Sequence, residues 1–316
     1  MGIDAILSVQ DVRKTFGAVK AVDGVSFDVA RGKITGLLGR NGAGKTTTLR
    51  MINGIFLPDT GVIRHAAVRG DAHDHVGYLP EERGLYKKMK VLEHLLFLAE
   101  IKGAPPAQSR PRAERWLERL DLSTKRDAKV EELSKGNQQK VQLIGTLLHE
   151  PDLVILDEPM SGLDPVNVVI VRGILEELSA QGRTVLLSTH MMGEAERMVD
   201  DLVLIHEGRV VLHGSLDAVK ASYGRNTLQL AFGGHGDPAF LAALPGVARA
   251  NVTNNEAELS LDAGVDPQPI LEACVGRLRL TKFLVAAPSL EEIFIDRVGK
   301  AGDARSAAPA PQGAVA

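Results

Sequence analysis

The sequence predicts an α/β fold with a buried parallel sheet, followed by a smaller α+β unit. Two short apolar runs, residues 153–156 and 184–187, have the continuous hydrophobic character of strands that are buried on both faces. A third run, Ile34–Leu38, leads directly into a glycine-rich loop and then into a helical segment. Beyond Tyr223 the strands and helices alternate in a different order, which indicates a second domain.

The composition is that of a globular protein from a reducing compartment. The chain has 316 residues, of which 44% are apolar, enough for one large or two ordinary domains. A net charge of −3 argues against a protein that coats nucleic acid. Cys274 is the single cysteine, and we interpret it as a buried apolar residue. Since the sequence has no signal peptide and no apolar run of about 18 residues, we expect a soluble chain that meets a membrane only through a partner.

The chain begins with two predicted strands, residues 7–15 and 18–30, in which apolar and polar residues alternate. Phe16 lies between them. An aromatic ring there could stack on a purine, but the local sequence alone favours a place in the core.

A glycine-rich loop follows the third strand. It consists of Gly39, Arg40, Asn41, Gly42, Ala43, Gly44, Lys45, Thr46 and Thr47. A glycine, four residues and then Gly-Lys-Thr is the spacing of a phosphate-binding loop, and the strand before it and the helix after it are the context which that motif requires. The glycines let backbone N–H groups turn toward a phosphate, and the helix N-terminus adds partial positive charge. Lys45 would reach the β- and γ-phosphates of a nucleotide, and the Thr46 hydroxyl would ligate Mg²⁺.

The middle of the chain changes from helical to strand character. Residues 87–150 show helical periodicity after a charged loop, 80–86, and are predicted to be a helical insertion. The apolar run that follows ends in Asp157 and Glu158, and two carboxylates at the end of a buried strand need a charged partner. The next buried strand ends shortly before His190.

The last third predicts a small α+β domain over residues 225–298. The order of strand, helix, strand, strand, helix, strand suggests a ferredoxin-like unit. Ser289 and Glu292 form a capping box that opens a final helix. One face of that helix carries Leu290, Ile293, Phe294 and Val298, and either the small sheet or a second copy of the chain should cover it. Residues 299–316 are rich in Ala, Pro and Gly, and we expect a disordered tail.

These motifs together resemble the ATP-binding subunit of an ABC transporter. The resemblance is carried by the phosphate loop, Leu133 to Asn137, Leu156 to Asp164 and His190, and it covers about residues 7–223. It implies a P-loop NTPase domain over residues 5–223, with a mixed sheet core, an antiparallel β subdomain and the helical insertion. Residues 77–86 and 288–294 and the small domain are similar to a bacterial exporter-type branch with an accessory C-terminal domain.

The resemblance also implies a role for each site residue. Phe16 would stack on adenine, and Gly39 to Thr47 would hold the phosphates of ATP. Asp157 would hold Mg²⁺ together with Thr46, and Glu158 would orient or deprotonate the attacking water. His190 would contact the γ-phosphate. Where the family usually has a Mg²⁺-ligating glutamine, this chain has Glu81 or Glu82, and we assign Glu81.

In such proteins two subunits meet head to tail around two ATP molecules. The signature residues Ser134, Lys135, Gly136 and Asn137 would then contact the ATP of the partner chain, and Asp164 would bridge the two halves. The sequence departs from the usual Gly-Gly-Gln after the serine, so close backbone approach rests on Gly136. The implied partners are a second subunit, most simply a second copy, and an integral membrane permease that holds the chain at the cytoplasmic face of the membrane.

Two other functions fit parts of the pattern. One is a soluble ABC-type ATPase that acts on ribosomes or nucleic acid, but the chain has one uninterrupted domain, no heptads and no basic run. We therefore favour ATP hydrolysis that powers transport, with export as the direction implied by the branch, and expect no nucleic-acid partner. The second treats the C-terminal unit as a ligand-binding regulator. Its sequence shows no convergent polar cluster, which favours a packing or dimer-supporting role.

Overall fold

The computed structural model describes residues 5–66, 75–82, 84–223, 227–233, 237–262 and 264–306. Packing contacts divide the chain into two units, Met1–Gly214 and Ser215–Ala316. No helix in the described ranges is long and apolar enough to cross a bilayer.

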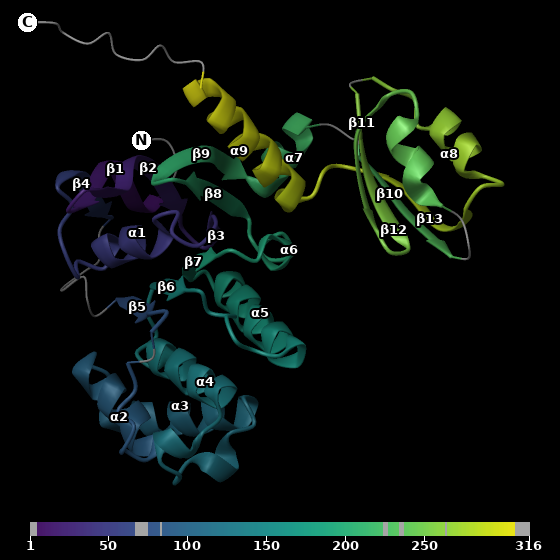
Figure 1. Cartoon of the computed structure of the whole chain (residues 1–316). Helices are drawn as coiled ribbons and strands as arrows, with labels where there is room; N and C mark the ends of the chain where they lie inside the picture. Colours follow the sequence, from purple (N-terminus) through teal and green to yellow (C-terminus); the bar gives the residue numbers. More distant parts are fainter. Residues whose placement is uncertain are drawn as a thin grey trace, which may run out of the picture. The chain divides into compact units, whose positions relative to one another are not determined.

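The first unit is built on a six-stranded sheet in the order β5-β6-β7-β3-β8-β9 (Figure 1). These strands are β3 (Ile34–Leu38), β5 (Val76–Leu79), β6 (Leu153–Asp157), β7 (Thr184–Thr189), β8 (Asp201–His206) and β9 (Arg209–Ser215). The pairs from β5 to β8 are parallel, and β3, β6 and β7 are buried along their whole length. The predicted buried parallel sheet is confirmed. Because parallel strands end at the same edge, the loops after β3, β6 and β7 converge there.

A second, antiparallel sheet has the order β2-β1-β4. Its strands are β1 (Ala5–Phe16), β2 (Val19–Ala30) and β4 (Thr60–His65). The sequence indicated only a turn where β4 begins. Gly61 is a residue type typical of turns, but in the structure it lies inside β4 and is required there. Its φ of 92° lies in the left-handed region, and a Cβ would collide with the backbone of Asp11 in the neighbouring strand.

Helices flank the parallel sheet, and a helical layer lies at its β5 edge (Figure 1). The flanking helices are α1 (Lys45–Ile52), α5 (Pro165–Ala180) and the short α6 (Met192–Ala195). The helical layer consists of α2 (Val91–Ile101), α3 (Pro106–Arg119) and α4 (Lys135–Leu147), with short 3₁₀ turns at Ser123–Lys125 and Val130–Glu132. Since α4 packs on both α2 and β5, the helical insertion is tied to the edge of the sheet.

The second unit contains a four-stranded antiparallel sheet in the order β11-β12-β10-β13. Its elements are α7 (Leu216–Tyr223), β10 (Thr227–Gly233), β11 (Val247–Thr253), β12 (Glu256–Leu261), α8 (Gln268–Cys274), β13 (Arg279–Ala286) and α9 (Leu290–Ser306). This strand order is that of a ferredoxin-like unit. The first predicted helix is a 3₁₀ helix, Pro238–Ala243, and Cys274 is buried in the core as expected.

The second unit begins earlier, and its last helix ends later, than the sequence predicted. Tyr223 Oη donates a hydrogen bond to Asp296 in α9 at 3.2 Å, which places α7 with the second unit, whereas the sequence put the boundary after Tyr223. The capping box is present, with Ser289 N donating to Glu292 at 3.1 Å. The helix runs to Ser306 rather than ending before residue 299, and the remainder of the predicted tail lies outside the described residues.

The apolar face of α9 is covered within a single chain. Leu290, Ile293 and Phe294 are 3%, 1% and 9% exposed, respectively, and Val298 is half-buried. Since the three are buried before any second copy binds, a twin subunit is not required to cover this face. The first turn lies against the sheet, because Ser260 Oγ of β12 donates to Glu292 at 3.4 Å.

Candidate active site

The loop between β3 and α1 is shaped by two glycines that no other residue could replace. Gly44 caps the N-terminus of α1 with a φ of 103°, and a Cβ there would abut the carbonyl oxygen of Ala21. A Cβ on Gly39 would abut the carbonyl oxygen of Ile205. Both glycines therefore let the loop pass close to neighbouring backbone.

Lys45 is a buried cation that three oxygens surround. Its side chain is 6% exposed, and Nζ donates to the carbonyl oxygens of Gly39 at 2.8 Å and Arg40 at 3.2 Å. It also lies 3.3 Å from Oε1 of Glu158. The lysine is thus positioned inside the loop, where a phosphate oxygen could take the place of one of these partners.

Asp157 lies at the end of β6 and is completely buried. Its Oδ1 accepts hydrogen bonds from Ser188 Oγ at 2.5 Å and Thr46 Oγ1 at 3.2 Å, while Oδ2 has no hydrogen-bond partner among the described residues. Burial raises the pKa of this carboxyl group, and the two hydroxyl donors oppose that shift. A buried carboxylate with one oxygen still to be satisfied is a good candidate ligand for a cation.

Glu158 connects the buried lysine to an exposed histidine. Its Oε2 lies 3.0 Å from Nδ1 of His190, while its Oε1 faces Lys45. The backbone of Glu158 has a φ of 49°, in the left-handed region where a side chain is strained, and its N–H donates to Ser188 O at 3.2 Å. The strained turn therefore aims this carboxylate across the end of the sheet, toward the phosphate loop.

Sequence reasoning assigned no role to Ser188, although the structure places it at the centre of this network. Its hydroxyl donates to Asp157, and its carbonyl oxygen holds the backbone N–H of Glu158. A polar residue near the end of a buried strand was the available signal. Its partners depend on the pairing of Asp157 with Ser188 across β6 and β7, which the sequence alone does not specify.

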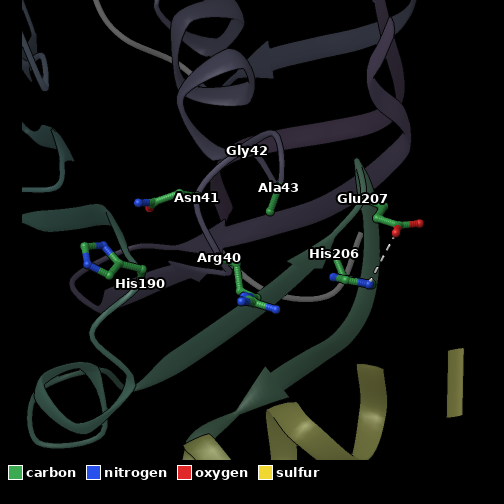
Figure 2. Close-up of a pocket in the computed structure, with 7 residues that line it drawn as sticks. All are labelled: Arg40, Asn41, Gly42, Ala43, His190, His206 and Glu207. Carbon is green, nitrogen blue, oxygen red and sulfur yellow. Dashed lines mark ion pairs between the residues drawn. The ribbon is translucent and has the colours of Figure 1, made fainter. Parts of the chain in front are cut away.

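Two pockets meet at the phosphate loop. The first, of about 540 Å³, is lined by Asn41 to Thr47, Glu158, Glu81, the 19–21 segment of β2, Glu207 and Gly208. The second, of about 550 Å³, is shown in Figure 2 and is lined by Arg40, Asn41, Gly42, Ala43, His190, His206 and Glu207. Figure 2 shows Asn41 and His190 on one side of this pocket and the His206–Glu207 ion pair, at 3.8 Å, on the other. The loop thus has open space on both sides, which a nucleotide and a second protein could occupy.

The structure separates the two candidate metal-ligating glutamates. Glu81 lines the pocket beside the phosphate loop, whereas Glu82 lies 3.8 Å from Arg50 and is 90% exposed. Gln142 of α4 donates to the carbonyl oxygen of Pro80 at 3.1 Å, which ties this loop to the helical layer. The placement favours Glu81, whose role as a Mg²⁺ ligand stays a prediction.

Phe16 is a surface residue, so its interpretation as part of the core is wrong. It is 50% exposed and packs edge-on against Phe56, with ring centroids 5.7 Å apart. Lys14 Nζ lies 5.8 Å from the centroid of its ring. An exposed, supported aromatic face near the β1–β2 turn is suited to stacking, and its contact with adenine remains a prediction.

The signature residues and Asp164 begin two helices. Ser134 caps α4 by accepting from Asn137 N at 3.3 Å, and both Ser134 and Lys135 are exposed. A Cβ on Gly136 would meet only Leu163 Cδ2, at an ordinary 3.8 Å. Asp164 caps α5 by accepting from Asn167 N at 3.0 Å, and this hydrogen bond lowers the pKa of its carboxyl group.

None of residues 134–137 lines either pocket of its own chain. The structure therefore brings together the phosphate loop, Asp157, Glu158 and His190, and leaves the signature outside that group.

Comparison with known proteins follows the same division of the chain. A family model described as ABC transporter matches residues 22–161. A second model, described as the C-terminal domain of DrrA1-3-like ATP-binding proteins, matches residues 214–298.

Relatives match over nearly the whole length. The uncharacterized ABC transporter ATP-binding protein YhaQ of Bacillus subtilis (strain 168) is 40% identical over 93% of this chain and 99% of its own. The Nod factor export ATP-binding protein I of Paraburkholderia xenovorans (strain LB400) is 37% identical over 94% of this chain and 98% of its own. A solved structure described as an ATP-binding subunit of an ABC transporter has a TM-score of 0.65 and 35% identity, and the match covers 69% of this chain and 93% of that one.

Proposed function

Because the chain belongs to the ATP-binding subunits of ABC transporters, whose ATPase domain couples ATP hydrolysis to transport, we propose that it powers export through a separate membrane permease. The exporting direction is supported by the relative whose name specifies Nod factor export. The single observation that carries the catalytic part is Glu158, which bridges buried Lys45 and exposed His190 beside the phosphate loop.

The residues divide the work of hydrolysis between binding and proton transfer. Lys45 would move its hydrogen bonds from the loop carbonyls and Glu158 to the β- and γ-phosphates, and the loop N–H groups would hold the remaining oxygens. Glu158, released from the lysine, would accept the proton of the attacking water. His190 would hold Oε2 of Glu158 and so keep that carboxylate directed toward the water.

The donor set at the end of β6 fits Mg²⁺. Thr46 and Asp157 supply the oxygen ligands that a hard cation prefers, and Oδ2 of Asp157 is buried without a partner. No group of three His, Cys, Asp or Glu side chains suited to a metal occurs among the described residues, but Mg²⁺ is usually held by one or two carboxylates together with phosphates. When bound, Mg²⁺ would supply charge neutralisation on the phosphates.

A second copy of the chain would complete the site. Ser134 and Gly136 lie at the exposed start of α4 and do not line their own chain's pockets. The backbone of Gly136 carries no side chain and lies at the start of a helix, which is suited to close approach of a phosphate. We therefore infer a head-to-tail homodimer in which each signature faces the partner's phosphate loop, with Asp164 near the contact between the halves.

The permease contact would lie at residues 81–86. Leu85 is half-buried and Tyr86 is 51% exposed, and this loop joins the Glu81 pocket to the helical layer. Aromatic residues of this kind are frequent interface anchors. Docking there would place the chain at the cytoplasmic face of the membrane.

Crosslinking in membranes that contain the cognate permease tests this function. A Leu85→Cys variant should crosslink to the permease in an ATP-dependent manner, whereas a cysteine at exposed Val275 in the second unit should not. Crosslinks formed only from position 275 would refute the docking site. A parent chain that releases no phosphate from ATP would count against the catalytic assignment.

A further inference from the structure

The loop that leads into α2 is hydrogen-bonded to the segment that precedes the signature. Val130 N donates to Met89 O at 3.0 Å, and Lys90 and Lys129 form an antiparallel bridge. Segments 87–91 and 128–131 therefore lie side by side as a short two-stranded ribbon at the edge of the helical layer.

This ribbon and the turn before it carry a cluster of exposed cations, which we call the basic strip. Its members are Lys87, Lys88, Lys90, Lys125, Arg126 and Lys129. Arg126 pairs with Asp127 at 3.1 Å, whereas the lysines of the strip form no ion pair within the described part of the chain. Acidic side chains border the strip in sequence: Glu93 follows Lys90, and Glu131 and Glu132 follow Lys129.

The basic strip does not stabilise the folded chain. Lys90 and Lys129 face each other across the ribbon, and like charges directly opposite one another destabilise an antiparallel pair. The chain as a whole has a net charge of −3, so a generally basic surface is not the cause. A negatively charged partner outside the chain would relieve this repulsion.

We propose that the basic strip binds the anionic lipid headgroups of the membrane in which the permease lies. This inference rests on the proposed function, which brings the chain to a membrane surface. Lysine is a hydrated point charge on a flexible stem and suits a diffuse anionic surface, and clusters of four to eight basic residues beside a membrane are typical of such binding.

One exposed apolar side chain next to the strip fits a lipid partner. Phe97 of α2 is 36% exposed, and its ring lies edge-on to Tyr86 with centroids 5.2 Å apart. Tyr86 is assigned to the permease contact, so the lipid argument rests on the lysines and uses only the apolar ring of Phe97, a residue type that enters the membrane interface. The ribbon continues through Val130–Glu132 to Ser134, so lipid contact would fix the segment that leads to the signature.

Vesicle co-sedimentation with the purified full-length chain tests the proposal. The chain should bind vesicles of phosphatidylcholine that contain phosphatidylglycerol, should ignore pure phosphatidylcholine, and should detach as salt is raised. The triple variant Lys87→Gln, Lys88→Gln, Lys90→Gln should bind on the order of 100-fold more weakly, because each lysine near an anionic surface contributes roughly fivefold. Replacing the same lysines with arginine should preserve binding.

A matched control removes the same charge from the second unit. The variant Arg249→Gln, Arg279→Gln, Lys282→Gln changes three exposed cations and should bind vesicles as the parent does. Equal weakening in both triple variants would show that binding follows net charge, and the strip would not be the site. Parent-like vesicle binding by the lysine variant, combined with loss of its crosslink to the permease, would assign the strip to an acidic permease segment and overturn the proposal. Phosphate release by the free chain tests the catalytic assignment separately, since no vesicle is needed.

Discussion

Replacing Glu158 with glutamine tests two properties of the Lys45–Glu158 pair at once. The two charged atoms lie 3.3 Å apart, and their side chains are only 6% and 7% exposed. Glutamine keeps the size of the side chain but removes its charge and its ability to accept a proton. We therefore expect a loss of turnover together with an altered response to nucleotide.

The expected magnitudes follow from this burial. Loss of a general base lowers turnover by about 10²-fold or more. Removing one partner of a buried ion pair costs about 3–5 kcal/mol when nothing replaces it. Lys45 keeps its hydrogen bonds to the carbonyl oxygens of Gly39 and Arg40, so we expect a smaller loss of stability without nucleotide, about 1–3 kcal/mol. ATP phosphates would restore negative charge beside Lys45, so ATP should stabilise the variant more than it stabilises the parent.

Thermal melting with and without ATP and Mg²⁺, together with phosphate release, measures both effects. The matched control is Glu82→Gln, because Glu82 is 90% exposed and lies 3.8 Å from Arg50, and it should behave as the parent does. If Glu158→Gln melts at the parent temperature without nucleotide and gains no additional stability from ATP, the buried pair contributes nothing. Unchanged phosphate release would refute the assignment of Glu158 as the base.

Four further variants test other parts of the site and the fold. Lys45→Ala should abolish tight ATP binding in calorimetry, and parent-like affinity would refute the phosphate-loop assignment. Gly136→Ala should not lower the melting temperature, because a Cβ there makes only an ordinary contact and alanine favours the helix, but it should lower turnover if a partner's nucleotide approaches the glycine. Full activity would contradict that approach. Burial raises the pKa of Asp157, so the contribution of this carboxyl group to stability is fully present below its unfolded pKa and is lost as pH rises through its folded pKa. Asp157→Asn should therefore flatten the fall in melting temperature over that pH range and should abolish hydrolysis. An unchanged pH profile of the melting temperature would contradict this. Phe294→Asp should destabilise the chain by about 3 kcal/mol or more, and unchanged melting would show that the helix is peripheral.

Residue patterns along the chain predicted the helices, strands and phosphate loop, but they did not predict which side chains meet between neighbouring strands. The spacing from Gly39 to Thr46 was enough to recognise the phosphate loop, because strand, loop and helix are contiguous there. The roles of Asp157 and Glu158 required the neighbouring strand, whose Ser188 holds both. The comparisons show an ATP-binding subunit of an ABC transporter, and several motifs in order, rather than any single contact, predicted that family from the sequence.

The second unit shows the same limit more clearly. The sequence showed no convergent polar cluster, yet the structure has a pocket of about 490 Å³ with such a cluster between β11, β12 and α9. Its polar lining residues are Arg249, Asn251, Glu258, Ser260, Glu292 and Asp296. They are distant in sequence and converge because β11 pairs with β12 and Ser260 contacts α9. The convergence of these side chains could therefore not be read from the sequence, and the packing or dimer-supporting role expected for this unit stays a prediction.

The most direct test of the shared site is to mix two inactive variants. Lys45→Ala disables the phosphate loop, and Ser134→Arg places a bulky cation at the exposed start of α4 where the signature would meet the partner's nucleotide. A mixed dimer has one complete site, built from the intact loop of one chain and the intact signature of the other. If sites are shared head to tail, mixing equal amounts should restore phosphate release to about a quarter of the parent rate, since half of the dimers are mixed and each has one competent site. If each variant is inactive and their mixture stays inactive although the two chains associate, or if Ser134→Arg alone hydrolyses ATP at the parent rate, the site is not shared between two copies.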